Sequence, residues 1–167
     1  MKFLESSAVI SPCERYRYVL RRRWKPGPTI LWILHNPSVA DAIIPDPTLR
    51  KGVGFSDRWG FGALVYGNLF ALRATDSKEV PKAGLVAAIG PENDHWLDLL
   101  IGEHEHVILA WGALNPKMVE QRMPALAALL EKHHRAVWCL GTSQHGQPLH
   151  PLMLGYDTER QVIHHEP

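Results

Sequence analysis

The sequence has few cysteines, no long hydrophobic run and almost no net charge, and each of these features excludes a class of protein. Cys13 and Cys139 are its only cysteines, too few for a disulfide framework and without the paired spacing of a zinc site. The longest apolar runs, near residues 29–34 and 64–72, are well short of the ~20 residues that span a membrane. A net charge of +1 argues against a protein that grips long duplex nucleic acid, which usually shows a strongly basic face.

The first residues and the overall composition favour a single cytoplasmic domain. The opening segment MKFLESSAVISP lacks the apolar stretch of a signal peptide, so we expect a protein of the reducing cytoplasm. The 167 residues are 46% hydrophobic and 21% charged, which is ordinary for a globular chain that buries one core. No repeat, low-complexity tract or linker divides the sequence, and we predict one domain over residues 1–167.

The hydrophobic pattern predicts strands that alternate with helices. The segment RYRYVLRRRW, residues 15–24, alternates like a half-buried strand that is antiparallel to its neighbour or lies at an edge. Continuous apolar runs predict buried strands over residues 29–34, 63–69, 107–110 and 136–140. Amphipathic stretches predict helices from Asp46-Pro47 to about Trp59, after Gly90-Pro91, and from Asn115-Pro116 to Lys132. We therefore predict a three-layer α/β/α fold whose sheet is mostly parallel and has four to five strands.

Polar clusters follow the four predicted core strands at the point where each strand ends. Ligands of open α/β sheets bind outside the carboxyl ends of the strands, because loop amides and helix N-termini converge there. The amino ends of the same strands show no comparable clusters. The sequence therefore predicts a polar pocket at the carboxyl edge of the sheet. Its candidate residues are Asn36, Pro37, Ser38 and Asp41 after the first core strand, Asn68, Phe70 and Arg73 after the second, Trp111 after the third, and Gly141, Thr142, His145 and His150 after the fourth.

Each candidate also has an ordinary structural explanation. Asn36 can cap the turn at Pro37, and Asn68 can bond a loop carbonyl. His150 can be a hydrogen-bonded core histidine, and Trp111 can belong to the core. The four coincident strand-end clusters favour a site over these separate explanations.

Several long motifs run through the chain at these strand ends. They are RYRYVLRRRW, NPSVADA, DPTLRK, WGFGAL, NLFALRATD, IGPEND, LAWG and GQPLHPL. Together, from Arg15 to about Leu154, they resemble a bacterial and phage family known as domain of unknown function family 1643. The resemblance implies no established activity, only that the strand-end motifs form the family's site.

The order of the motifs is similar, more distantly, to that of uracil-DNA glycosylase-like proteins. In that superfamily the loop after the first core strand orients the attacking water, an asparagine after the second strand reads the base, and a histidine before a proline stabilises the departing base. The resemblance implies these roles for Asn36 or Asp41, for Asn68, and for His150. The sequence departs from that pattern at Leu152, where the superfamily has serine.

The expected ligand is therefore a nucleobase, nucleoside, nucleotide or single flipped base, the expected chemistry is of the N-glycosidase type, and no cofactor is expected. In this hypothesis Arg73 and the backbone amides near Gly141-Thr142 hold a phosphate, and Trp111 or Phe70 stacks on a base.

Three alternatives use parts of the same sequence. A non-catalytic nucleotide-binding module would use the same pocket, and the absence of Gly-x-Ser-x-Gly, Walker lysine and His-Glu-x-x-His motifs favours it. A partner-binding protein would use the basic strand of residues 15–25. A metal-dependent hydrolase would use histidines and a carboxylate from different loops. Those residues are His35, His145, His150 and Asp41 or Asp46.

Overall fold

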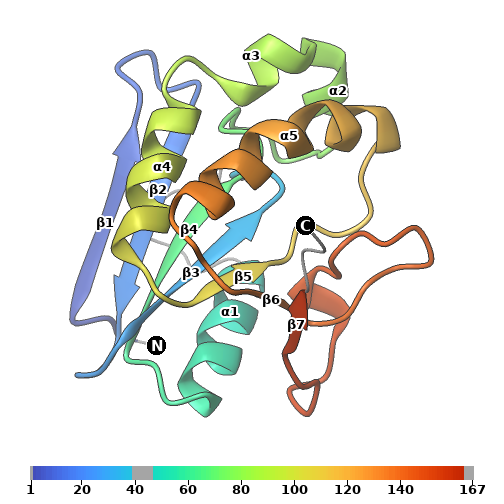
Figure 1. Ribbon diagram of the computed structural model, residues 1–167. Helices are drawn as coiled ribbons and strands as arrows, with labels where there is room; N and C mark the ends of the chain where they lie inside the picture. Colours follow the sequence, from blue (N-terminus) through green and yellow to red (C-terminus); the bar gives the residue numbers. More distant parts are fainter. Residues whose placement is uncertain (1, 39–46, 164–167) are drawn as a thin grey trace.

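Seven strands form one sheet in the computed structural model, which describes residues 2–38 and 47–163. The strand order is β1-β2-β4-β3-β5-β6-β7, and helices lie on both faces (Figure 1). The strands are β1 (Glu5–Ile10), β2 (Arg17–Arg23), β3 (Thr29–Leu34), β4 (Ala63–Asn68), β5 (Val107–Leu109), β6 (Val137–Cys139) and β7 (Gln161–Ile163). The helices are α1 (Pro47–Arg58), α2 (Glu79–Ala83), α3 (Leu85–Ile89), α4 (Asn93–Glu103), α5 (Pro116–Lys132) and the 3-10 turn η1 (Pro151–Met153).

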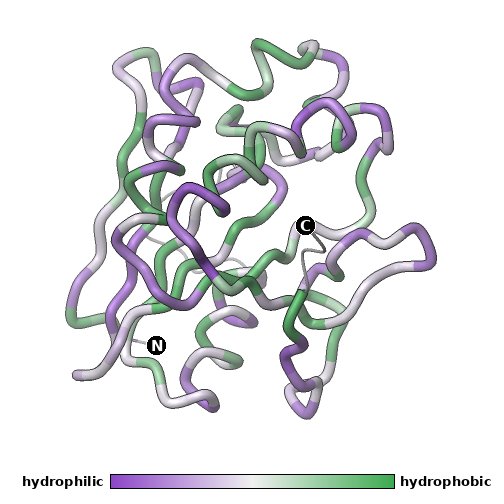
Figure 2. The backbone as a smooth tube through the Cα atoms, in the orientation of Figure 1, coloured by the Kyte–Doolittle hydropathy of each residue, from purple (hydrophilic) through white to green (hydrophobic). Residues whose placement is uncertain are grey.

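The four strands predicted from continuous apolar runs form the parallel centre of the sheet. β3 pairs with β4 on one side and with β5 on the other, and β5 pairs with β6, all in parallel. Every residue of β4 and β5 is buried, because side chains on both faces of these strands are covered. Figure 2 shows the hydrophobic segments concentrated along the central strands.

The prediction of a mostly parallel sheet of four to five strands is wrong. β1 and β2 pair antiparallel to each other, β2 pairs antiparallel with β4, and β7 pairs antiparallel with β6, so the sheet is mixed. The two edge strands have mostly exposed or half-exposed side chains, and therefore lack the apolar pattern by which a sequence identifies a strand. β2 is antiparallel, as predicted, but lies inside the sheet between β1 and β4.

The two faces of the sheet are covered by different helices. Val53 and Phe55 of α1 pack with Trp32 of β3 in one core, while Leu97 of α4 and Leu126 of α5 belong to the core on the other face. α1 connects β3 to β4, and α5 connects β5 to β6. The neighbouring strands β3 and β5 therefore send their following helices to opposite faces, which is the arrangement of a doubly wound sheet.

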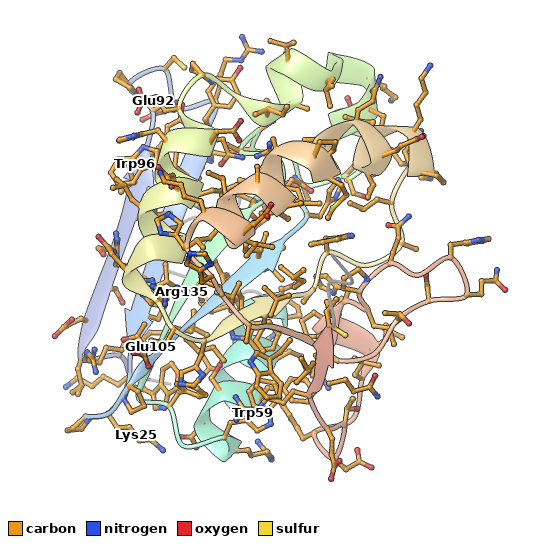
Figure 3. All side chains as sticks on the ribbon, viewed as in Figure 1. Lys25, Trp59, Glu92, Trp96, Glu105 and Arg135 are labelled. Atoms are coloured by element: carbon orange, nitrogen blue, oxygen red, sulfur yellow. The ribbon has the colours of Figure 1, made fainter. Side chains whose placement is uncertain are left out.

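The amino ends of the parallel strands are closed by contacts within the chain. Trp24 Nε1 donates to Asp57 Oδ1 of α1 at 2.9 Å, and Lys25 forms an ion pair with the same carboxylate. Figure 3 shows Lys25 and Trp59 at this end of the molecule. Within the described ranges, no helix combines the length and the apolar character needed to cross a bilayer.

Candidate functional site

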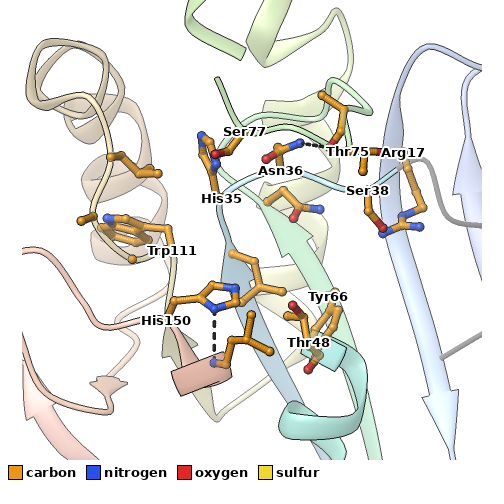
Figure 4. A pocket seen from close by; sticks show the side chains of 17 residues that line it. Arg17, His35, Asn36, Ser38, Thr48, Tyr66, Thr75, Ser77, Trp111 and His150 are labelled. Carbon is orange, nitrogen blue, oxygen red and sulfur yellow. Dashed lines mark hydrogen bonds between the residues drawn. The ribbon is translucent and has the colours of Figure 1, made fainter. Parts of the chain in front are cut away.

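A cavity of about 410 Å³ opens at the carboxyl edge of the sheet. Its walls come from the chain after β3, β4 and β5, from the first residue of β2, and from α1 and η1, as Figure 4 shows. The lining residues are Arg17, Leu34, His35, Asn36, Ser38, Thr48, Tyr66, Asn68, Ala74, Thr75, Ser77, Trp111, Gly112, Ala113, Leu114, His150 and Leu152.

The position of the cavity follows from the order of the strands. The chain leaves β3 toward α1 on one face and leaves β5 toward α5 on the other face. The segments after these two neighbouring strands therefore diverge and leave a crevice between them, which is where open α/β sheets bind ligands. Both segments line the cavity, His35 and Asn36 on one side and Trp111 to Leu114 on the other.

Asn68 brings a buried amide to the cavity wall. It is the last residue of β4 and only 3% exposed. Its side chain makes no hydrogen bond to any residue that the structure describes, yet it lines the cavity. The amide faces the cavity, so a ligand or water there can supply hydrogen bonds to it.

The backbone at Asn68 is fixed from behind by two buried side chains. Asn93 Nδ2 at the start of α4 donates to the carbonyl oxygens of Asn68 and Leu69, at 3.0 and 3.1 Å. Arg122 Nε of α5 donates to Leu69 O at 2.9 Å, and its guanidinium also pairs with Asp94. Asn93 is fully buried and Arg122 is 1% exposed. These contacts fix the backbone at the end of β4, from which the Asn68 side chain projects.

Asn36 uses its amide nitrogen to hold the loop after β4. Its Nδ2 donates to Pro37 O at 3.1 Å, to Ala74 O at 3.0 Å and, more weakly, to Leu72 O at 3.4 Å. Ala74 N in turn donates to Pro37 O at 3.0 Å. The Oδ1 atom of Asn36 accepts no hydrogen bond from the described residues, so an acceptor remains on this lining residue.

His150 accepts a backbone hydrogen bond through one of its ring nitrogens. Its Nδ1 accepts from Leu152 N at 3.2 Å in the turn η1. An accepting Nδ1 in a neutral ring places the hydrogen on Nε2, which can then donate to a ligand. The close approach of His150 requires glycine at position 112, because a Cβ there would lie 2.9 Å from His150 Cβ, and Gly112 also has a φ of +79°.

His35 contributes a neutral imidazole to the same cavity. Burial, with a smaller contribution from the nearby His150, lowers the pKa of His35 from 6.5 to about 4. Its ring meets Phe70 edge-on, with centroids 5.6 Å apart. At neutral pH His35 therefore acts as a hydrogen-bonding group without charge.

Arg17 and a group of hydroxyl side chains were not among the predicted pocket residues. Arg17 is 7% exposed and lines the cavity from the start of β2. The alternating pattern of residues 15–24 had placed the arginines on the solvent side, and a bulge in β2 removes that alternation. The hydroxyl residues come from α1, from β4 and from the loop after β4, where no local pattern marks them. They are Thr48, Tyr66, Thr75 and Ser77.

Of the residues predicted to form the pocket, Asn36, Ser38, Asn68, Trp111 and His150 line the cavity. Pro37 is buried next to them, and Phe70 lines an adjoining cavity of about 240 Å³. Asp41 lies outside the described residues.

Four predicted residues do not line the cavity. Arg73 donates from its guanidinium to Glu14 O at 2.9 Å, between β1 and β2. Gly141, Thr142 and His145 belong to the segment after β6, where Thr142 pairs with Pro148 and His145 is exposed. This segment forms its own turn, because Leu149 N donates back to Gly141 O at 2.9 Å, and that turn carries His145 away from the cavity.

The ligand set of a metal-dependent hydrolase is only partly assembled. His35 and His150 line one cavity, whereas His145 does not, and Asp41 and Asp46 lie outside the described residues. Over residues 2–38 and 47–163, no three side chains of histidine, cysteine, aspartate or glutamate come close enough to share a metal ion.

Residues 17–152 match the family described as Protein of unknown function (DUF1643). The chain belongs to this family. The matched range includes every residue that lines the cavity, from Arg17 to Leu152. No curated protein and no solved structure matches the chain, and the likeness of this DUF1643 protein to the uracil-DNA glycosylase layout stays a prediction.

Proposed function

We propose that the cavity binds the base of a nucleoside, a nucleotide or a flipped-out nucleotide, and that the protein cleaves its N-glycosidic bond. The observation that carries the proposal is the Asn68 amide, which is 3% exposed, lines the cavity and has no hydrogen-bond partner among the described residues. A carboxamide offers a donor and an acceptor side by side, which is the complement of a base's pairing edge.

The remaining walls are compatible with a base and its sugar. Trp111 presents an aromatic ring, His35 a neutral imidazole, and Leu34 and Leu114 apolar surface. A volume of about 410 Å³ is in the range of small-molecule pockets. Aromatic and apolar surface combined with a few fixed polar groups suits a flat, hydrogen-bonding ligand.

The proposed reaction is hydrolysis of the bond between the sugar C1′ and the base nitrogen. The bonding electron pair leaves with the base, the oxygen of a water molecule adds to C1′, and the water's proton ends on the base. His150 Nε2–H donates a hydrogen bond to the base as negative charge develops there; a preorganised donor of this kind contributes about 3 kcal/mol to the transition state. Asn36 Oδ1 accepts a hydrogen bond from the water and orients it.

One observation favours a second candidate function, a binding module without turnover. In the described part of the lining no aspartate or glutamate is present, so the cavity wall there contains no carboxylate base. A pocket with hydrogen-bonding groups but weak acid and base groups is sufficient for ligand binding.

The proposal is tested by measuring both binding and base release. The purified protein is screened by thermal shift and calorimetry against adenosine, guanosine, cytidine, uridine and thymidine, their 5′-monophosphates, the free bases and a uracil-containing single strand. Free base is measured by chromatography. Asn68→Ala is expected to weaken binding by roughly 10- to 100-fold. The hydrogen bonds between the amide and the base edge contribute about 1.5–3 kcal/mol to the free energy of binding, and the variant loses them.

Matched variants separate the site from general effects. Gln121→Ala repeats the loss of a carboxamide in Asn68→Ala at an exposed position of α5 and is expected to leave binding unchanged. His150→Gln is compared with His145→Gln on the exposed turn. Loss of turnover with retained affinity in His150→Gln indicates an enzyme, whereas loss of affinity alone indicates a binding module. If the wild-type protein neither binds any of these compounds nor releases a base, the proposal is wrong.

A further inference from the structure

The start of β2 contains a bulge that turns Arg17 toward the cavity. Ile10 pairs with Arg17 and Val9 pairs with Val19, so Tyr18 is an extra residue on β2. Tyr18 and Val19, although adjacent, both belong to the core on the α4 side of the sheet. Without the extra residue, Arg17 would lie on the same face as Val19, because side chains two positions apart share a face. Bulges are common next to functional sites, where they redirect a side chain.

Arg17 gives the cavity a positive end. It is 7% exposed, and it lines the cavity from the first residue of β2. Among the described lining residues it is the only one with a permanent charge, since no aspartate or glutamate lines the cavity there. Its five N–H donors allow it to contact the chain and a ligand at the same time.

The two ends of the cavity differ in chemistry. Figure 4 shows Arg17 next to Ser38, with Thr75 close by, whereas Trp111 and His150 lie at the other end. Arg17 starts β2 and Trp111 follows β5, three strand positions away in the sheet, which corresponds to about 14 Å. A base that lies against Trp111 and Asn68 leaves the arginine and hydroxyl end for another part of the ligand.

We propose that this end, formed by Arg17, Ser38 and Thr75, binds a phosphate group, so that the ligands are nucleotides rather than nucleosides or free bases. Guanidinium groups bind phosphate oxygens through two parallel hydrogen bonds, and hydroxyl groups supply further donors. The phosphate is either the monoester of a free nucleotide or the diester of a strand. This inference rests on the proposed function for the base half of the ligand, but it has its own residue and its own test.

The test compares ligands with and without phosphate in wild type and in Arg17 variants. Affinities of the five nucleosides, their 5′-monophosphates, inorganic phosphate and a dinucleoside phosphate are measured by calorimetry at one pH and ionic strength. The monophosphate of the bound base is expected to bind roughly 10- to 100-fold tighter than the nucleoside, the effect of charge-assisted hydrogen bonds. Tighter binding of the dinucleoside phosphate than of the monophosphate identifies a strand as the source of the phosphate.

Arg17→Gln is expected to reduce the affinity for the monophosphate to that for the nucleoside, while nucleoside affinity changes less than about threefold. Arg17→Lys keeps the charge without the planar guanidinium group and is expected to retain part of the difference in affinity between monophosphate and nucleoside. The lysine variant also replaces the glutamine variant in this test if the latter does not fold. Arg21→Gln is the control, since Arg21 is on the same strand, pairs at the surface with Glu103 and does not line the cavity.

The outcomes separate the two proposals. Nucleosides and monophosphates that bind equally to wild type would overturn the phosphate site while leaving base binding intact. If monophosphates bind tighter than nucleosides but both Arg17 variants keep the same difference in affinity, the phosphate site is also overturned. Inorganic phosphate that binds through Arg17 while no nucleoside binds would support the anion site and refute base recognition.

Discussion

The ends of β3 and β4 each bring an asparagine to the rim of one cavity, yet the two amides have different surroundings. Asn36 donates its Nδ2 to three carbonyl oxygens and joins the loops after both strands. Asn68 makes no side-chain hydrogen bond within the described chain, although it is more deeply buried. The amide nitrogen of Asn36, which is satisfied internally, stabilises the fold, whereas the Asn68 amide, which faces the cavity, has both its donor and its acceptor available to a ligand.

The largest effect is expected where the end of β4 is held from behind. Arg122→Ala removes a buried guanidinium that bonds Leu69 O and Asp94, and we expect the free energy of unfolding to fall by about 4 kcal/mol. Urea denaturation measures it. The control is Lys132→Ala on the same helix, whose surface ion pair with Asp98 should contribute less than about 1 kcal/mol. Equal losses in the two variants would show that Arg122 does not fix this strand end.

The end of β3 contains a group that makes stability depend on pH. The pKa of His35 is about 4 in the folded protein and about 6.5 in an unfolded chain. The unfolded chain binds more protons between these values, so the stabilisation is complete above pH 6.5 and is lost as the pH falls toward 4, by about 3 kcal/mol. His35→Gln should flatten the stability curve over this window, measured by denaturation from pH 4 to 7.

Two other histidines define the controls for that experiment. His145→Gln, on the exposed turn after β6, should keep the slope of the wild type. The pKa of His104 is also lowered by burial. Part of the pH dependence of stability should therefore remain in the His35 variant. An unchanged slope in His35→Gln would mean that the imidazole of His35 titrates alike in the folded and unfolded chain.

A smaller loss is expected for the amide that joins the two loops. Asn36→Ala leaves the carbonyls of Pro37 and Ala74 without this donor, and we expect a loss of about 2 kcal/mol in the free energy of unfolding. Thermal and urea unfolding measure it. A loss below about 0.5 kcal/mol, the usual range of surface substitutions, would remove the distinction between the two asparagines.

The smallest effect on stability is expected at Asn68 itself. Asn68→Ala breaks no side-chain hydrogen bond to a described residue and removes an amide that faces the cavity, so stability should change by less than about 1 kcal/mol in either direction. The same denaturation experiment, run beside Asn36→Ala, gives the comparison directly. If Asn68→Ala proves as destabilising as Asn36→Ala, then Asn68 is a structural residue and base reading loses its main support.

The sequence alone determined the elements that surround the cavity. Apolar runs identified β3 to β6, the Asn115-Pro116 pair identified the first turn of α5, and the polar strand ends indicated the carboxyl edge as the place of the site. These features depend on periodicity and capping, which involve residues close together in the chain. The long motifs also identified the family, because they extend over most of the sequence.

The tertiary structure alone decided which polar residues face the cavity and which are used within the fold. Asn36 finds its acceptor at Ala74, 38 positions away, and the same packing gives the Asn68 side chain no partner among residues 2–38 and 47–163. Arg17 enters the cavity because a bulge forms where β2 meets β1, whereas Arg73, at an equally promising strand end, bonds Glu14 instead. Hydrogen-bond partners and strand register are set by segments that meet only after folding, and no local pattern in the sequence records them.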